Sequence, residues 1–506
     1  MRDVLTIITS CVLPVALTAC VSNGAKPNGD LAQLAQNPAT ALAEAAPYDD
    51  QDMLSVLTHA SLRRLSGDYR GSNTALDRAY GLNDELYTQG LSELSAASLL
   101  NPGASPYRPN PLEVGFISYL KALNHLDMSD ANNALQQREA AAVEMRRLDI
   151  LQGESRYLRD MDADDERIDE LAQLVVAMFN DRGTAELGEG LVDIQAPWLY
   201  ALSGIIYEAN NDLDSAQLAY RRALTMLSPE APLTETQRNL RQVVLSNGHR
   251  CLSALGYSDE AIAESPFSSA SATAATGGRW LIQHDGALPA KAPLEMLLTA
   301  DSIAQRLILR PMIRGSEAEK TAQRRVFAEL SRHYNSPYKD AIVIELGDNW
   351  SAADSLGLTA TIGGGVRIFI DYLADSAPEP SAQLQTADGQ TLPMTTIADI
   401  AGDLRRHQQR TLSLRFEEAL LRELSKSAGY KSMTGGLSLP FSLGGAMATF
   451  SAAADLRQWQ WLPARIRLAH IPDNALASEA LQLREGDQQH RLPINGDQAV
   501  LTSHQY

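Results

Sequence analysis

The spacing of apolar residues changes once along the chain. Through 48–256 apolar positions recur every three to four residues and β-branched runs are few, which predicts α-helices. From 277 to 506, short apolar runs bounded by Gly, Pro, Asp and Asn predict strands, with amphipathic helices near 316–334 and 397–427. The predicted strands cover 279–283, 305–310, 341–346, 366–373, 464–471 and 492–501. Between the two regions, 257–276 is rich in Ser, Ala and Thr and predicts a linker.

The clearest unit of the helical region spans 196–229. Small residues stand where two helices would cross closely, and tyrosines would fill the space beside the crossing. These positions are Gly204, Tyr207, Ala216, Tyr220 and Ala223. Their spacing resembles the tetratricopeptide repeat, a helix–turn–helix of about 34 residues. A generic helical bundle is the alternative interpretation.

A second copy of this unit fits residues 53–85. It repeats the small positions of the first copy with Ala60, Ser72 and Ala79. A third, weaker copy begins near Ala122. Because the copies are not separated by multiples of about 34 residues, we expect an irregular solenoid with extra helices between the units.

Residues 1–19 are typical of a bacterial lipoprotein signal peptide. Arg2 supplies a positive start, and the apolar segment that follows is shorter than the roughly 20 residues that span a bilayer. Leu17-Thr18-Ala19-Cys20 resembles a lipobox, in which a peptidase cuts before a cysteine that carries lipid. We therefore predict that Cys20 is the lipidated N-terminus of the mature chain. An ordinary secretory signal with a stray cysteine is the alternative.

Residues 20–47 are rich in Asn, Pro, Ala, Gln and Gly and predict a lipidated tether with an r.m.s. span of roughly 25–30 Å. Cys11 would leave with the signal peptide, and Cys251 is the remaining cysteine. No intramolecular disulfide can then form in the mature chain. We expect Cys251 to be a buried apolar residue; an intermolecular bridge is the alternative.

Charge narrows the classes of partner. The net charge is −19 and the isoelectric point is about 4.9. Such a balance argues against nucleic acid, which needs a basic surface, and against adhesion to anionic lipid. No stretch after the signal peptide is long and apolar enough to span a bilayer, so attachment is predicted to rest on the lipid.

Several common catalytic motifs are absent from the sequence. It lacks a phosphate-binding loop, a dinucleotide fingerprint and a Gly-x-Ser-x-Gly elbow, and its nine histidines are scattered, so no cofactor or metal is expected. The acidic run 160–166 departs from a calcium loop where Gly and Glu are required, and we interpret it as a helix N-terminus. Gly363 to Gly365 predict a turn before a strand, and 435–445 predicts a strand pair with turns.

Asp455, Arg457 and Trp459 alternate at strand spacing and would share one face of a strand. We interpret them as a structural ion pair beside a packed tryptophan. The alternative is a polysaccharide or peptide contact through Trp459.

Four segments carry a family resemblance: 142–148, 278–291, 414–426 and 454–466. The last contains the motif Asp455, Arg457, Trp459 and Pro463. Together they resemble an uncharacterised family of bacterial outer-membrane lipoproteins with tetratricopeptide-like helices. The resemblance implies no catalytic residues. Family members often lie near penicillin-binding-protein activator lipoproteins, which implies a role in envelope biogenesis.

These observations predict an α+β multidomain protein, with an irregular α-solenoid over 48–256 and an α+β domain over 277–506. The predicted function is a scaffold or adaptor on the periplasmic face of the outer membrane that binds an envelope protein through its helical repeats. The alternative is an envelope enzyme acting on peptidoglycan or exopolysaccharide, whose carboxylates would converge only in the folded chain.

Replacing Cys20 with serine tests the predicted anchor. Because lipid is transferred to the thiol, C20S should leave an uncleaved precursor without lipid. Val21 and Ser22 follow the cysteine, rather than the aspartate that commonly retains lipoproteins in the inner membrane. The wild-type mature chain should therefore sediment with outer membrane in a sucrose gradient. Its recovery from the soluble periplasmic fraction would contradict the anchor.

Overall fold

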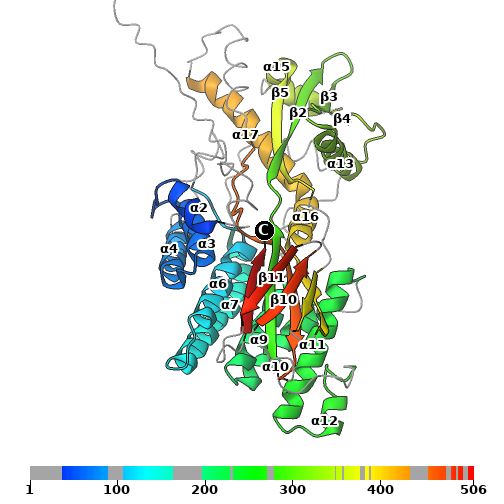
Figure 1. Ribbon diagram of the computed structural model, residues 1–506. Helices are drawn as coiled ribbons and strands as arrows, with labels where there is room; N and C mark the ends of the chain where they lie inside the picture. The colour runs from blue at the N-terminus through cyan, green and yellow to red at the C-terminus, as the bar shows by residue number, and fades with distance from the viewer. Residues whose placement is uncertain are drawn as a thin grey trace, which may run out of the picture.

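The computed structural model has an α+β fold in which a row of helices packs against one of three β-sheets (Figure 1). The structure describes residues 37–88, 106–162, 196–227, 232–269, 278–347, 349–355, 358–375, 382–386, 389–433, 454–473, 480–485, 488–493 and 500–505.

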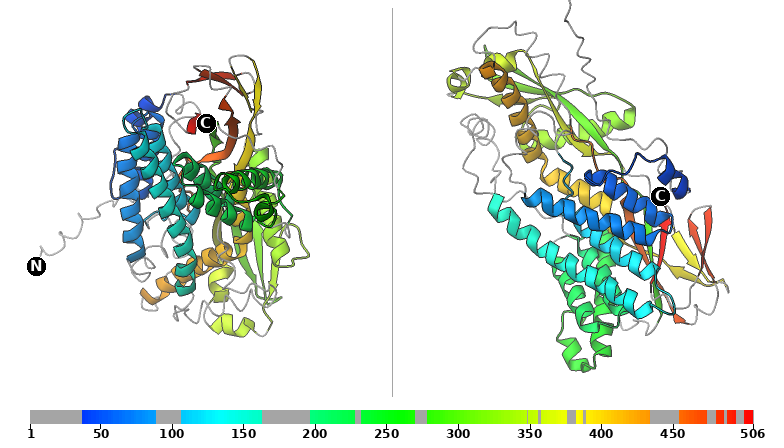
Figure 2. Two further views of the ribbon diagram at one scale, coloured as in Figure 1. Left: turned by 90° about the horizontal axis from the view of Figure 1, so that it is seen from below. Right: turned by 90° about the vertical axis from the view of Figure 1, so that its left-hand side faces the viewer.

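The helical region is a succession in which each described helix contacts the next one along the chain. The helices nearest the N-terminus run side by side in both views of Figure 2. Their bounds are α2 Pro38–Glu44, α3 Met53–Leu65, α4 Tyr69–Thr88, α6 Pro111–Asp127, α7 Ala134–Asp162, α9 Pro197–Ala209, α10 Leu213–Met226, α11 Glu235–Ala254 and α12 Asp259–Ala263.

Sheets A and C form two stacked layers beside these helices. Sheet A has the order β12-β1-β9-β8, with β1 parallel to β12 and its other pairs antiparallel. Its strands are β1 Arg279–Ala287, β8 Thr395–Asp399, β9 Pro463–Ile471 and β12 Val500–Gln505. Sheet C is antiparallel with the order β11-β10-β6-β7. Its strands are β6 Ala382–Gln385, β7 Thr391–Pro393, β10 Ala480–Glu485 and β11 Gln488–Pro493.

Sheet A is the middle layer because both of its faces are covered. Side chains alternate between the faces of a strand, and in β1 Ile282 joins the core of the helices whereas Leu281 joins the core between sheets A and C. Leu384, Leu481 and Leu483 of sheet C complete that second core.

Sheet B forms a lobe with its own core at the upper end of Figure 1. Its order is β4-β3-β2-β5, with the strands β2 Lys291–Asp301, β3 Arg306–Pro311, β4 Ile342–Glu345 and β5 Val366–Leu373. Leu298 and Ile368 of this sheet share a core with Phe327 of α13 and Phe416 of α17. The helices of this region are α13 Glu317–His333, α14 Asn349–Ser355, α15 Leu358–Gly363, α16 Ile400–Arg410 and α17 Leu412–Met433.

Side-chain caps fix the start of α6. The Asn110 side chain accepts a hydrogen bond from the Glu113 amide at 3.0 Å, and the Glu113 carboxylate accepts one from the Asn110 amide at 2.8 Å. Pro111, which has no N–H to leave unsatisfied, occupies the first turn. This capping box satisfies two amides that the helix itself cannot pair.

Small residues lie where paired helices touch. A Cβ added to Gly204 of α9 would lie 2.4 Å from the Tyr220 ring of α10, so only glycine fits there. Ala216 and Ala223 of α10 are fully buried, as is Tyr207 of α9. In the preceding pair, Ser72 of α4 donates a hydrogen bond to the Ala60 carbonyl of α3 at 2.8 Å, and Ala79 is fully buried.

Five of the predicted strands are present, as β1, β3, β4, β5 and β9, and the predicted helix at 316–334 is α13. The strand predicted at 492–501 is wrong, because β11 ends at Pro493, which has no N–H for a further ladder bond, and β12 begins at Val500. The helix predicted at 397–427 is instead the end of β8 followed by two helices that break at Thr411. The prediction missed β2, β6, β7, β8 and β10; in β2 the run Leu-Glu-Met-Leu-Leu ends in three consecutive apolar residues and so does not alternate in hydrophobicity.

Several other predicted segments differ from the structure or lie outside it. Asp160 and Asp162 lie within α7 rather than at a helix start. Gly365 has φ +85° directly before β5, as expected for a glycine in a turn. The rest of the acidic run, the segment 435–445, the signal peptide and Cys20 lie outside the described residues.

Parts of the predicted tether and linker are folded. Ala41 of α2 is buried within the predicted tether 20–47. In the predicted linker 257–276, α12 forms, and Phe267 is fully buried where a Cβ on Gly248 would overlap its ring. One hydrophobic core also extends from the helices into β1, β8, β9 and β12. The helical region therefore folds together with sheet A.

Two glycine-to-alanine substitutions test the helix contacts. G204A should destabilise the fold by about 1–3 kcal/mol, because the new Cβ would overlap the buried Tyr220 ring. G81A is the matched control, because a Cβ there would contact only Arg78 at 3.5 Å within α4. It should stabilise the helix by up to about 1 kcal/mol. Chemical denaturation should move the two midpoints in opposite directions, and equal midpoints would contradict this packing.

Candidate functional site

A group of polar side chains lies where α3 and α6 meet sheet A, and we call it the junction cluster. It consists of Arg64 of α3, Tyr119, Asn124 and Asp127 of α6, His284 of β1, and Thr502 and His504 of β12. Its members come from both ends of the chain. It is therefore a feature of the assembled fold.

The centre of the junction cluster is a buried ion pair. Arg64 Nη2 lies 2.7 Å from Asp127 Oδ2, and the two side chains are only 2% and 5% exposed. Thr502 donates a hydrogen bond to the Asp127 carboxylate at 2.9 Å, and Arg64 also donates to Asn124. Burial raises the pKa of Asp127, and the Arg64 charge opposes this shift. The carboxylate is thus desolvated but well paired, as a buried charge must be.

Two histidines continue the cluster into the sheet. The Tyr119 hydroxyl and His284 Nε2 share a hydrogen bond of 2.9 Å, and the His284 and His504 rings lie 4.7 Å apart between centroids. Burial, reinforced by the Arg64 charge, lowers the pKa of His284 to about 3. His284 is therefore neutral at physiological pH, and the Tyr119 hydroxyl can donate to its free ring nitrogen.

A second buried contact ties the segment before β9 to α3 and α6. The Tyr107 hydroxyl donates to the Glu113 carboxylate at 2.7 Å, and burial raises the pKa of Glu113. The Trp459 amide reaches the same carboxylate at 3.4 Å, and its indole N–H donates to Ser61 Oγ at 2.9 Å. The carboxylate that caps α6 thus also positions Trp459.

The predicted motif residues lie beside this contact, but not on a strand. Residues 454–459 have no regular secondary structure, so the strand spacing inferred for Asp455, Arg457 and Trp459 is wrong. The local turn is held by the Arg457–Asp455 ion pair at 2.8 Å, and Trp459 is 1% exposed. Pro463 is the first residue of β9. The buried indole is unavailable for a ligand in this conformation.

A third polar group lies between sheets A and C. Asp285 Oδ2 is 2.7 Å from Arg465 Nε and 3.1 Å from Arg467 Nη2, and all three side chains are nearly or fully buried. The two arginines compensate the single carboxylate in this dry position.

These groups are buried and paired in this conformation. Perturbed pKa values often mark active sites, but the His284 side chain is only 1% exposed. Ser118 and Lys121 of α6 show the Ser-x-x-Lys spacing of a nucleophile and its base. Ser118 is fully buried against the Tyr80 hydroxyl, and the Lys121 ammonium is paired with Glu144 and Asp77. Neither residue is placed to react.

Metal binding and membrane spanning were considered for the described residues alone. These residues contain no group of three or more His, Cys, Asp or Glu residues able to hold a metal ion. None of the described helices is long and apolar enough to cross a membrane. Cys251 is buried with a free thiol.

Sequence reasoning found the helix contacts and missed the junction cluster. The repeat positions Ala60, Ser72, Ala79, Gly204, Tyr207, Ala216, Tyr220 and Ala223 are all buried at helix contacts or, for Gly204, against Tyr220. The available signal for the cluster was His284, an ionisable residue close after the apolar Trp-Leu-Ile of a predicted strand. Its partners are far away in sequence.

The buried His284 should make stability depend on pH. Because its folded pKa of about 3 lies below the ordinary 6.5, the unfolded chain binds the proton first as pH falls. Its contribution to stability is complete above pH 6.5 and is lost by about 1.4 kcal/mol for each pH unit toward pH 3. H284N should remove this part of the dependence in urea unfolding between pH 7 and 4.

The matched control is Y119F, which deletes the hydrogen bond but keeps the imidazole. It should lower stability by about 1–3 kcal/mol at every pH, because it leaves a buried ring nitrogen unpaired. If the free energies of unfolding of H284N and the wild type stay parallel over this range, the buried neutral histidine is contradicted.

The geometry above is not inherited from a known relative. No family model, no curated protein and no solved structure matches this chain. The function must therefore be argued from its own residues.

Proposed function

We propose that this protein is a lipid-anchored scaffold or adaptor on the periplasmic face of the outer membrane. It binds an envelope protein partner through an irregular α-solenoid of tetratricopeptide-like helix pairs, in the service of envelope or surface-polymer biogenesis. The observation that carries the proposal is a stripe of exposed apolar side chains on the helical region.

The solenoid is supported by the order of helix contacts. Each described helix from α2 to α12 packs on the next described helix along the chain, as stacked repeats do. The α9–α10 pair has glycine and alanine at its contact, and the α3–α4 pair has alanine and serine. One side of this row is occupied by sheet A, so a partner would bind the side turned away from it.

The partner surface is the outer face of α7. Leu135, Val143 and Ile150 are 66%, 55% and 60% exposed. At 3.6 residues per turn they lie within an arc of about 80° on the helix. Single exposed apolar residues are ordinary on protein surfaces, but several on one helix face are typical of a binding site.

The surface continues toward α10. Ion pairs of Arg146 with Asp212 and of Arg222 with Asp149 join α7 to α10. Leu218 is 44% exposed and lies one helical turn before Arg222, on the side of α10 that faces α7. The exposed Glu139 and Arg146 fall within the same arc of α7, so this surface mixes apolar and charged side chains, as many protein interfaces do.

The C-terminal region has a supporting role in this proposal. Sheet A covers the opposite side of the helices and shares their core, which holds the helical row in one shape. A preformed surface loses less conformational entropy on binding than a mobile one. Sheet B, with its separate core, would stand as a distinct lobe for a second contact.

One observation favours the alternative of an envelope enzyme. Burial raises the pKa of Asp403 to about 6 against the opposing charge of Arg406, and Asp399 adds a like charge nearby. A carboxyl group that titrates near neutrality beside a second carboxylate is the composition of an acid–base pair. Turnover of peptidoglycan or exopolysaccharide by the purified protein, abolished in D403N, would replace the scaffold proposal.

Two charges placed on the apolar stripe test the scaffold. In intact cells, chemical crosslinking of the lipidated wild type should yield a discrete complex of higher mass. V143E/I150E should reduce its yield at least about tenfold, because burying two unpaired carboxylates in an interface costs several kcal/mol. T74E/Q409E adds the same charge at exposed polar positions of α4 and α16, away from the α7 stripe, and should leave the yield unchanged.

The comparison requires that all three proteins are equally folded. The substituted residues are exposed, so their melting temperatures should agree within a few degrees. An undiminished complex in V143E/I150E, or an equal loss in T74E/Q409E, would contradict α7 as the partner surface.

A further inference from the structure

Sheet C presents a flat polar face to solvent. Its inner face packs on sheet A through Leu384, Leu392, Leu481 and Leu483. Because strand side chains alternate, the residues between these leucines point outward. The outward set is Gln383, Gln385, Thr391, Pro393, Gln482, Arg484, Gln489 and Arg491. All of these side chains are exposed except Gln385, which is half-buried.

The strand register arranges this outer face in two rows. Arg484 pairs with Gln489 on one side and Gln383 on the other, and Gln482 pairs with Arg491 and Gln385 in the same way. Each row therefore runs across the strands and contains one arginine side chain beside glutamine side chains. With strands about 4.8 Å apart, four strands give a face roughly 14 Å wide.

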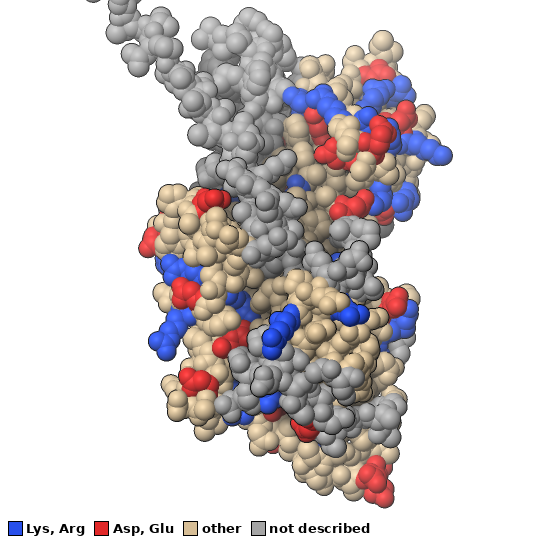
Figure 3. All heavy atoms as spheres, viewed as in Figure 1, with Lys and Arg blue, Asp and Glu red and all other residues tan. Residues whose placement is uncertain are grey.

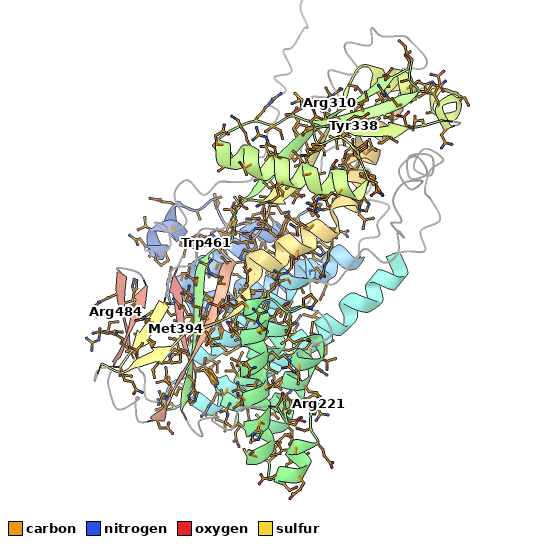
Figure 4. The ribbon with its side chains drawn as sticks, turned by 90° about the vertical axis from the view of Figure 1, so that its right-hand side faces the viewer. Arg221, Arg310, Tyr338, Met394, Trp461 and Arg484 are labelled. Carbon is orange, nitrogen blue, oxygen red and sulfur yellow. The ribbon has the colours of Figure 1, made fainter. Side chains whose placement is uncertain are left out.

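The described outward side chains of sheet C carry the opposite charge to the whole chain. The protein carries a net charge of −19, yet the described outward side chains of sheet C include two arginines and no carboxylate. In Figure 3 the front of the molecule over β10 and β11 shows Lys or Arg side chains on a mostly uncharged ground. Figure 4 shows Arg484 at the outer side of the sheet, away from the helices.

We propose that this face binds an extended acidic polysaccharide, such as a polyuronate. Arginine presents a planar fork of donors that matches a carboxylate in two hydrogen bonds. The glutamine amides offer both donors and acceptors, which suit the hydroxyl groups of successive sugar rings. A row of such side chains across four paired strands suits a polymer that lies across the strands.

Other anionic partners fit this face less well. A membrane surface selects lysine-rich faces with aromatic or leucine side chains that insert among lipids, and the described outward set has none of these. Single-stranded nucleic acid needs aromatic platforms for base stacking. Protein interfaces have apolar or aromatic centres, whereas the apolar member here is Pro393 alone among the described outward residues.

The inference is independent of the proposed protein partner. Sheet C is the layer on the far side of sheet A from the helices, whereas the apolar stripe lies on α7. Loss of one binding activity therefore says nothing about the other.

The experiment measures binding of the full mature chain to polygalacturonate immobilised on beads. The wild type should be retained, and retention should weaken as NaCl is raised, because salt screens exposed charges. R484Q/R491Q should weaken binding between about 2-fold and 30-fold, the range expected for two exposed ion pairs. R221Q/R310Q removes the same charge from α10 and β3, at two exposed positions labelled in Figure 4, and should bind as the wild type does.

Parallel binding measurements with other polymers and with lipid vesicles distinguish the possible ligands of this face. Neutral dextran should not retain the protein, and polyglutamate and phosphatidylglycerol vesicles should retain less than polygalacturonate. The proposal is overturned if the wild type is not retained on polygalacturonate or if both double variants lose binding equally. It is also overturned if dextran, polyglutamate or the vesicles bind at least as well as polygalacturonate.

Discussion

The fold depends on the burial of α6. Leu112, Phe116, Leu120 and Leu123 are buried, and so are polar residues on the other faces of this helix, including Asn124. A helix whose side chains are buried all round needs other helices or strands packed against each of its faces. Contacts with α4, α7, α9 and β12 provide that cover. The helical row and sheet A therefore form one folding unit, although the sequence predicts a linker between the two regions.

The junction cluster determines how these two parts fit. Hydrophobic contacts are not directional and would tolerate small shifts of α6 across the sheet. The Arg64–Asp127 pair and the Tyr119–His284 hydrogen bond do not tolerate such shifts. A shifted helix would leave buried charges or ring nitrogens unpaired. We infer that these polar contacts supply specificity of packing more than net stability.

Local features of the fold could be predicted from the sequence, and non-local ones could not. The Gly204 and Ala216 spacing indicated a close helix contact because both partners lie within one helical hairpin. The position of β12 beside β1 could not be predicted, because that parallel pairing joins residues at opposite ends of the C-terminal region. Asp127 pairs with Arg64, which precedes it in the sequence, and with Thr502, which follows it at a much greater distance along the chain. The periodicity of apolar residues contains no information about contacts between residues so far apart in the sequence.

The layered arrangement explains where binding surfaces can exist. Sheet A is covered on both faces, so its buried ionisable groups serve packing, and functional contacts fall to the outer layers. Those layers differ in chemistry: α7 exposes leucine, valine and isoleucine, and sheet C exposes arginine and glutamine. An apolar stripe suits binding to a protein. A face of glutamine and arginine side chains suits binding to an acidic polymer. Because both layers pack on the same middle sheet, the two surfaces are held in a fixed relation, as the proposed adaptor between a protein and a polymer would require.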